Sequence, residues 1–410
     1  MRMIRLIFIS ALVLFLQAYA FGGTADYLLP ATRQILKNHI AAYFAEQLTN
    51  PQKKNRKSLS QFGYNLSLLA FPLYPITSFI NPDKFGIQSY GKPGIKEYNG
   101  SLYTCKAGFM DFSHIRCAAD WTVFLTFKII TDNGDFDLPP EAGSLNLHFQ
   151  QLDKLTLEDI ASLAQRIAFE RLVWHEVASW HYHPPNFIAS EQQSTFTPED
   201  VYSDFLGTVI GRNIALRILK NMDTIAYSQI ATEEIEKTIS VLEPLTTKKG
   251  SAEAYDIVDR NKQLKLPDDK RNKDIWYDSQ IPFTDERYMF KRNMSIGPVM
   301  TPWLVPHPEQ LGCPAKPKAD LLYVPQQTTS GTPINAYYTF SIHPDSILFY
   351  NKNTGNELHP PFATFTTLHY KTIMRQIKTE MQEKLLAGFD KRNSFDPVPY
   401  FKGAHKVLFK

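Results

Sequence analysis

Residues 157–180 read LEDIASLAQRIAFERLVWHEVASW, and this run predicts a long helix at the centre of the protein. Its apolar side chains would point in nearly every direction around a helical cylinder, so the helix should be buried on most sides. Thr156 stands at the N-cap and Asp159 at the third helical position, where both can satisfy free backbone N–H groups. A buried central helix needs other elements packed around it.

The residues on either side predict such elements. Helical spacing of apolar residues is found in 32–47, 113–130, 232–245, 251–261 and 364–386, and in the proline-interrupted run 66–80. Another helix should begin at Pro198, after Thr197, and continue to residue 221. Prolines and aromatic residues between 264 and 361 indicate packed loops, with short strands at 320–324 and 336–342. We therefore expect a mainly α protein, with a buried multi-helix core and a smaller irregular, partly β C-terminal lobe.

The first twenty residues are typical of a cleavable secretory signal. Arg2 and Arg5 precede an apolar run, and Ala18-Tyr19-Ala20 forms a small-x-small cleavage site. The apolar run is too short to span a bilayer. We expect an exported protein, in a periplasm, at a cell surface or secreted. The remaining chain divides into a mainly helical domain at 21–262, which holds the candidate site, and a region at 263–410 packed on the same body.

Composition and charge exclude several classes of function. The net charge of +3 falls to +1 once Arg2 and Arg5 are removed, and no basic stripe with interleaved aromatic residues suggests a nucleic-acid partner. No later run of about 18 apolar residues suggests a transmembrane anchor. The sequence also lacks a glycine-rich phosphate loop, a Gly-x-Ser-x-Gly elbow and paired Cys-x-x-Cys sites.

Three cysteines in an exported chain allow one disulfide and leave one thiol. Cys105 and Cys117 are the natural pair, because they lie twelve residues apart across a turn into a predicted helix. An oxidising compartment would favour this bond. If it forms, Cys313 is a buried structural thiol.

A first group of chemically active residues lies in 108–116. Asp111 stands at a predicted helix start with His114 three residues later, and a carboxylate beside an imidazole can orient it or share a metal with it. Arg116 and Asp120 are four residues apart and can form an ion pair. The structural interpretation is a capping Asp, a histidine at the edge of the core and an ordinary ion pair.

A second group lies on the predicted central helix itself. Arg166 and Glu170 are four residues apart and can satisfy each other, as buried ionisable groups must. His175-Glu176 resembles the first half of a zinc protease motif, which needs a second histidine four residues after the first. Ser179 occupies that position, so the motif is incomplete and a zinc protease site is excluded.

A third group follows Pro198. Asp200, Asp204, Gly207 and Gly211 are spaced by four, three and four residues and fall on one stripe of the predicted helix. Two glycines there allow another backbone to approach closely, and two carboxylates beside that contact are costly unless they hold a cation, an arginine or a proton. Alternatively, Asp200 is a first-turn residue favoured by the helix dipole and Asp204 its exposed companion.

In combination, these segments resemble a family of exported bacterial proteins known as a domain of unknown function. The likeness is carried by Gly-x-x-Asp-x-x-His-x-Arg at 108–116 with Ala-Asp-Trp at 119–121, by Trp-His-Glu at 174–176 within 170–180, and by Pro-Glu-Asp-x-Tyr-Ser at 198–203 with Gly207. The resemblance implies that the three helices form one unit. It supplies no activity and no catalytic residue.

Our leading hypothesis is a hydrolase-like site between the three helices. It would work with a divalent metal such as zinc, or without metal through a carboxylate or imidazole base. The candidate metal ligands are His114, His175, Asp200 and Asp204. The candidate catalytic residues are Glu176 as base, Asp111 and Arg116. The substrate would belong to the cell envelope or the extracellular space.

The rival hypothesis is a non-catalytic envelope or secreted binding protein. In it, the same polar residues form a buried network of hydrogen bonds and ion pairs that fixes the packing of the helices. Arg116, Arg166 and Arg171 favour this reading, because each offers a structural partner to a nearby carboxylate. Access separates the hypotheses, since a catalytic cluster must be open to its substrate.

Overall fold

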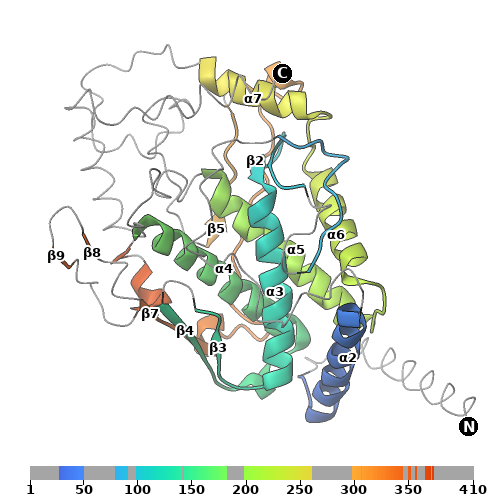
Figure 1. Cartoon of the computed structure of the whole chain (residues 1–410), viewed down its shortest axis with the longest axis vertical. Helices are drawn as coiled ribbons and strands as arrows, with labels where there is room; N and C mark the ends of the chain where they lie inside the picture. Colours follow the sequence, from blue (N-terminus) through green and yellow to red (C-terminus); the bar gives the residue numbers. More distant parts are fainter. Residues whose placement is uncertain are drawn as a thin grey trace, which may run out of the picture.

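A computed structural model gives the architecture of the chain (Figure 1). It describes residues 27–49, 79–90, 98–140, 143–181, 198–260, 298–305, 307–344, 350–351, 356–357, 365–370 and 372–373. The helices within these residues are α2 (Pro30–Thr49), α3 (Phe112–Asp132), α4 (Leu157–His181), α5 (Pro198–Lys220), α6 (Tyr227–Val241) and α7 (Lys248–Arg260). The expected mainly α fold, with a small sheet-containing C-terminal region, is confirmed.

Three long helices, α3, α4 and α5, pack against one another and form the core. In Figure 1, α2 and α6 lie on one side of this trio and α7 lies near one end of it. The central helix α4 is buried on most sides, as its composition predicts, with Ile160, Ile167 and Trp174 fully enclosed.

The start of α4 has the capping arrangement expected from the sequence. The backbone N–H of Asp159 donates to Thr156 Oγ1 at 3.1 Å, and the backbone N–H and hydroxyl of Thr156 donate to the Asp159 carboxylate at 3.1 and 2.8 Å. The same carboxylate accepts from the backbone N–H and the hydroxyl of Thr329 at 2.7 and 2.9 Å. The cap therefore also ties the C-terminal region to the helical core.

Helices α3 and α5 approach each other closely at two glycines. A Cβ added to Gly207 would lie 2.3 Å from the carbonyl oxygen of Ile115, and one added to Gly211 would lie 2.4 Å from that of Ala119. No side chain fits at such distances, so the predicted close backbone approach is confirmed. This contact fixes how α3 and α5 are placed along each other. It therefore also fixes where the polar residues one turn before Gly207 lie relative to α3.

An antiparallel sheet joins the middle of the chain to its C-terminal region, in the order β10-β7-β4-β3. Its strands are β3 (Phe136–Leu138), β4 (Gly143–Phe149), β7 (Tyr338–Pro344) and β10 (Phe365–Thr366). The pair β4–β7 runs from Gly143 opposite Pro344 to Phe149 opposite Tyr338. Sequence analysis found β7 but did not identify β3 and β4, although Leu145 and Leu147 alternate with exposed or half-buried neighbours.

A short hairpin leads into α3. It consists of β1 (Ser101–Thr104) and β2 (Gly108–Asp111), paired antiparallel. Gly108 has φ +67° and forms a bridge with Trp303, whose carbonyl oxygen would lie 1.8 Å from an added Cβ. The segment that contains Trp303 also contributes β5 (Val299–Met300), which pairs with β6 (Leu322–Tyr323) in the predicted strand at 320–324.

The disulfide prediction is wrong: Cys105 bonds to Cys313, and Cys117 remains a thiol. Cys105 lies in the turn of the β1–β2 hairpin, in an apolar cluster with Tyr103 and Cys313, and its Cα is 5.4 Å from that of Cys313. Cys117 lies instead on α3 and packs against the main core. Nearness in sequence was therefore a poor guide to the bond.

Two predicted helices need correction. The helix expected at 364–386 does not begin as such, because Phe365 and Thr366 form β10 and pair with Ile342 and Ser341 of β7. The helix expected at 232–245 is α6, which begins five residues earlier at Tyr227 and ends at Val241.

Other expectations fall outside the described residues. They concern the secretory signal at 1–20, the helix at 66–80 apart from its last two residues, and the part of the helix expected at 364–386 that lies beyond residue 373. The described residues also include the short antiparallel pair β8 (Tyr350–Asn351) and β9 (Asn356–Glu357).

Within the described part of the chain, no helix has the length and apolar character needed to cross a membrane.

Candidate metal centre

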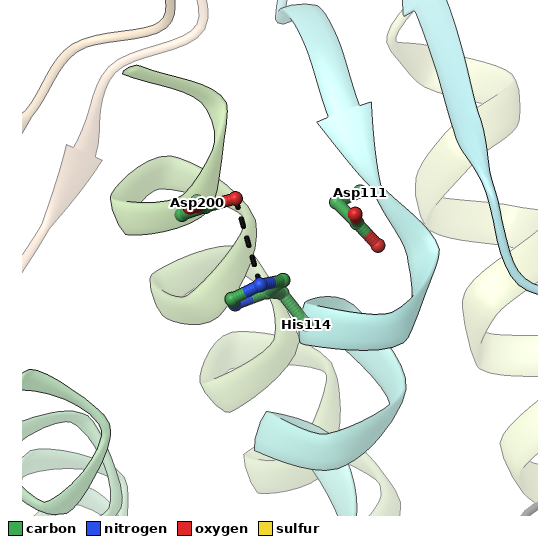
Figure 2. Close-up of side chains that lie close together, drawn as sticks. All are labelled: Asp111, His114 and Asp200. Atoms are coloured by element: carbon green, nitrogen blue, oxygen red, sulfur yellow. Dashed lines mark ion pairs between the residues drawn. The ribbon is translucent and has the colours of Figure 1, made fainter. Parts of the chain in front are cut away.

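Five ionisable side chains from four elements meet where α3 and α5 begin. Asp111 ends β2, and His114 lies in the first turn of α3. Asp200 lies in the first turn of α5, Asp204 one turn later, and Glu176 on the C-terminal half of α4. Figure 2 shows the side chains of Asp111 and Asp200 on either side of the imidazole of His114.

His114 lies between the two carboxylates of α5. Its Nδ1 is 2.9 Å from Oδ1 of Asp204, and its Nε2 is 3.5 Å from Oδ1 of Asp200 (the dashed line in Figure 2). Because Asp200 and Asp204 are four residues apart, they lie on one stripe of the helix and can contact opposite edges of one ring. The sequence predicted this stripe, and the close contact at Gly207 brings it to α3.

Asp111 is held by the backbone around it. Its Oδ1 accepts from the backbone N–H of Ser113 at 2.6 Å and also from the hydroxyl of that serine, so Asp111 is the N-cap of α3. Its own backbone N–H donates to Oγ of Ser203 at 2.9 Å. Ser203 was quoted in the family likeness but received no role in the sequence analysis, and it links β2 to α5 between the two aspartates.

Two overlapping groups of metal-ligand atoms result. The outer group consists of Asp111, His114 and Asp200, and the inner group of His114, Glu176 and Asp204. In each group, one ligand atom per residue lies within 4.8 Å of the others. Among the described residues these are the groups of three or more such ligands, and His114 belongs to both.

Burial distinguishes the two groups. The side chain of His114 is 23% exposed and Asp111 is half-buried, whereas those of Asp200 and Asp204 are 8% and 3% exposed, and Glu176 is buried. Solvent therefore reaches the cluster from the side of Asp111 and His114.

The cluster is electrostatically unbalanced towards negative charge. Burial lowers the pKa of His114, but the charges of Asp200 and Asp204 outweigh burial, and the pKa lies well above its ordinary value. Burial raises the pKa of Asp200 well above its ordinary value; His114 opposes this rise, while Glu199, Glu176 and Asp111 add to it. Four carboxylates around one imidazole retain a proton, or would take up a cation in its place.

The guanidinium of Arg116, predicted as catalytic, contacts the segment 79–90. Its guanidinium donates to Oε1 of Gln88 at 2.7 Å and to the backbone carbonyl of Phe85. Gln88 in turn donates to Asp120 at 3.0 Å, and Asp120 also accepts from the hydroxyl of Tyr227. Arg116 belongs to neither ligand group and joins α3 to the segment 79–90.

Arg166 and Glu170 of α4 form a pair that also contacts the sheet. Arg166 Nε bonds to Glu170 at 2.7 Å, as predicted, and Glu170 accepts from the hydroxyl of Tyr338 on β7 at 2.7 Å. The guanidinium of Arg171 lies 4.3 Å from the ring centre of Trp121. His175 is half-buried and, among the described residues, belongs to neither ligand group.

The comparisons with known proteins agree with the likeness drawn from sequence only in that they find a domain of unknown function. No curated protein and no solved structure matches the chain significantly. The model of a family described as "Protein of unknown function (DUF4056)" matches residues 48–306, more than half of the chain. That range contains the hairpin, all three core helices and every residue of the cluster. The chain therefore belongs to the DUF4056 family of proteins of unknown function.

Proposed function

We propose that the protein is an exported, divalent-metal-dependent hydrolase whose metal lies in the cluster around His114. The observation that carries this proposal is the convergence of the two ligand groups on one imidazole at a partly exposed position. A perturbed ionisable cluster of this kind is more typical of a functional site than of a packing network.

The donor set fits a divalent metal. One imidazole together with carboxylate oxygens suits zinc, manganese or iron, and the carboxylates supply the negative charge that such an ion needs. Asp111 can contribute Oδ2, because its capping bonds are made by Oδ1. A metal bound there would lower the pKa of a water molecule and polarise the bond to be cleaved.

The side chains would divide the remaining work of hydrolysis. Glu176, in the inner group, is our candidate for the base that takes a proton from the attacking water. The oxygen of that water would bond to the electrophilic centre, the bond from that centre to the leaving group would break, and the proton would pass from Glu176 to the leaving group. His114 and Asp111 lie on the solvent side, where a substrate would arrive.

Two observations support export and an envelope or extracellular substrate. The first is the signal-like sequence at residues 1–20. The second is the bond between Cys105 and Cys313, because structural disulfides persist mainly in oxidising compartments.

The direct test is the metal content of the purified protein, measured by mass spectrometry after gentle dialysis. We expect about one ion per chain in the wild type and a loss in His114→Ala. His148→Ala is the matched control, since His148 forms an equally short contact of 2.9 Å with Asp135 in an exposed pair away from the cluster. A folded wild type that binds no zinc, manganese or iron would overturn the proposal.

Hydrolysis is tested on the same three proteins with ester, amide, phosphoester and glycoside substrates, including cell-wall polymers. Activity should disappear with a chelator and in His114→Ala, and persist in His148→Ala. A metal-loaded wild type that cleaves none of these substrates would refute hydrolase activity and leave a metal-binding protein.

A further inference from the structure

We infer that the metal occupies the outer group of Asp111, Nε2 of His114 and Asp200, and that Asp204 is a positioning residue that holds the imidazole through Nδ1. This inference rests on the proposed function and goes beyond it, because it chooses between the two ligand groups. It also separates residues that bind the ion from a residue that acts through His114.

The two contacts of His114 differ in length. Nδ1 and Asp204 are 2.9 Å apart, which is the ordinary length of an N–H···O hydrogen bond. Nε2 and Asp200 are 3.5 Å apart. Two ligands bound tetrahedrally at about 2.1 Å from a zinc ion are separated by about 3.4 Å. The Nδ1 distance is therefore that of a hydrogen bond, and the Nε2 distance matches the separation of two ligands of one ion.

The chemistry of imidazole leads to the same choice. A neutral imidazole carries one N–H donor and one lone-pair nitrogen, so one edge binds a metal while the other donates a hydrogen bond. A carboxylate that receives this bond fixes the tautomer and makes the ligating nitrogen more basic. With Asp204 receiving the Nδ1 proton, Nε2 keeps its lone pair directed towards Asp200.

Burial supports the outer group as well. Asp204 is 3% exposed, as suits a residue that orients another from behind, whereas Asp111 is half-buried on the solvent side. A catalytic metal keeps a coordination position open for water and substrate, and that position must be accessible. The outer group meets this condition through Asp111 and His114.

The outer ligands are also anchored independently. The capping bond to the Ser113 N–H and the backbone bond to Ser203 fix Asp111 at the end of β2. Asp200 belongs to the first turn of α5, whose register against α3 is set at Gly207. Asp200 already lies 3.5 Å from Nε2, and a ligand atom of Asp111 lies within 4.8 Å of those of His114 and Asp200.

The experiment loads the full-length protein, labelled with ¹⁵N-histidine, with zinc and records long-range proton–nitrogen correlations. His114 should show a protonated Nδ1 and a metal-bound Nε2. In Asp204→Asn the amide oxygen can still accept the Nδ1 proton, so zinc should bind about 10- to 100-fold more weakly in the same tautomer.

The matched variants are Asp111→Asn and Glu176→Gln. Asparagine is as good an N-cap as aspartate, so Asp111→Asn preserves the helix start while weakening the metal site. We expect it to lose zinc far more than Asp204→Asn does, and Glu176→Gln to retain zinc.

The opposite results would overturn the inference. These are a metal-bound Nδ1 in the wild type, or zinc lost in Asp204→Asn and Glu176→Gln but kept in Asp111→Asn, either of which would place the ion in the inner group. Both leave the proposed metal function intact. A wild type that binds no metal removes the proposed function itself, so the two failures can be told apart.

Discussion

Replacing Gly207 by alanine should push α3 and α5 apart beside the cluster. The new Cβ would lie 2.3 Å from the Ile115 carbonyl oxygen and 2.6 Å from Cβ of Ala118, whereas real Cβ atoms essentially never approach within 3.0 Å. The helices must therefore separate by about 0.7 Å or more at this point, and the obstructing carbonyl belongs to the backbone of a helix and cannot rotate away.

The expected cost follows from two opposing effects. Overpacking of this kind destabilises a core by about 1–3 kcal/mol. Alanine in place of glycine within a helix contributes about 1 kcal/mol in the other direction. Because an obstructing atom is backbone, we take the upper part of the range and expect a net loss of about 2 kcal/mol. The shift also separates His114 from Asp204, so zinc affinity should fall with stability.

Urea denaturation followed by circular dichroism measures the stability, and calorimetric titration measures zinc binding. Gly134→Ala is the control, since its nearest neighbour would be 4.0 Å away, and it should change stability by less than about 0.5 kcal/mol. If Gly207→Ala is as stable as this control and binds zinc equally well, α3 and α5 are not in close contact there and the geometry of the cluster is wrong.

Three further predictions concern the cap, the disulfide and pH. Thr156→Ala should lower the free energy of unfolding by about 1 kcal/mol, measured by urea denaturation, because it removes the N-cap of α4. Reduction, or Cys105→Ser, should destabilise the protein by up to about 5 kcal/mol, because the bond to Cys313 spans a sequence separation of 208 residues. In the metal-free protein, the raised pKa of His114 means that its protonation stabilises the fold. This contribution is complete below about pH 6.5 and is lost as the pH rises through the folded-state pKa, so the urea concentration at the unfolding midpoint should decrease as the pH is raised above about 6.5.

Each of these predictions has a result that contradicts it. Thr156→Ser keeps the capping hydroxyl, and an equal loss in both variants would show that the cap is not the cause. A non-reduced digest should contain a peptide pair linking Cys105 to Cys313; a Cys105–Cys117 pair would reverse the correction made above. The fall of stability with pH should be smaller in His114→Gln, and an unchanged slope would mean that other groups produce it.

Local signals in the sequence were sufficient for the starts of α4 and α5. Thr156 with Asp159 marks the start of α4 because capping chemistry depends on neighbours within one turn, and Pro198 marks the start of α5 because proline favours the first helical position. The stripe of Asp200, Asp204, Gly207 and Gly211 was visible for the same reason. It predicted both the close contact and the carboxylates beside it.

Features that depend on distant partners were not accessible in this way. Besides its neighbour β3, the strand β4 pairs with β7 nearly two hundred residues later, and Cys105 has its partner at Cys313. Spacing along the chain says nothing about such pairs, and it favoured the wrong disulfide. His175 was included because it neighbours Glu176, but adjacent residues on a helix point about 100° apart, and of the two Glu176 belongs to a ligand group.

Two buried carboxylates, Glu170 and Asp200, have different electrostatic surroundings. This difference is why we interpret the cluster as a functional site. At Glu170, burial raises the pKa, but Arg166 and the hydroxyl of Tyr338 both lower it, so the surroundings stabilise the ionised form as a packing network should. At Asp200, His114 lowers the pKa, while Glu199, Glu176 and Asp111 raise it further. A site that served packing alone would gain stability by replacing some of these acidic residues with apolar ones of similar size. Their concentration around one imidazole is costly in the absence of a cation, and a bound divalent ion would reverse the sign of that cost.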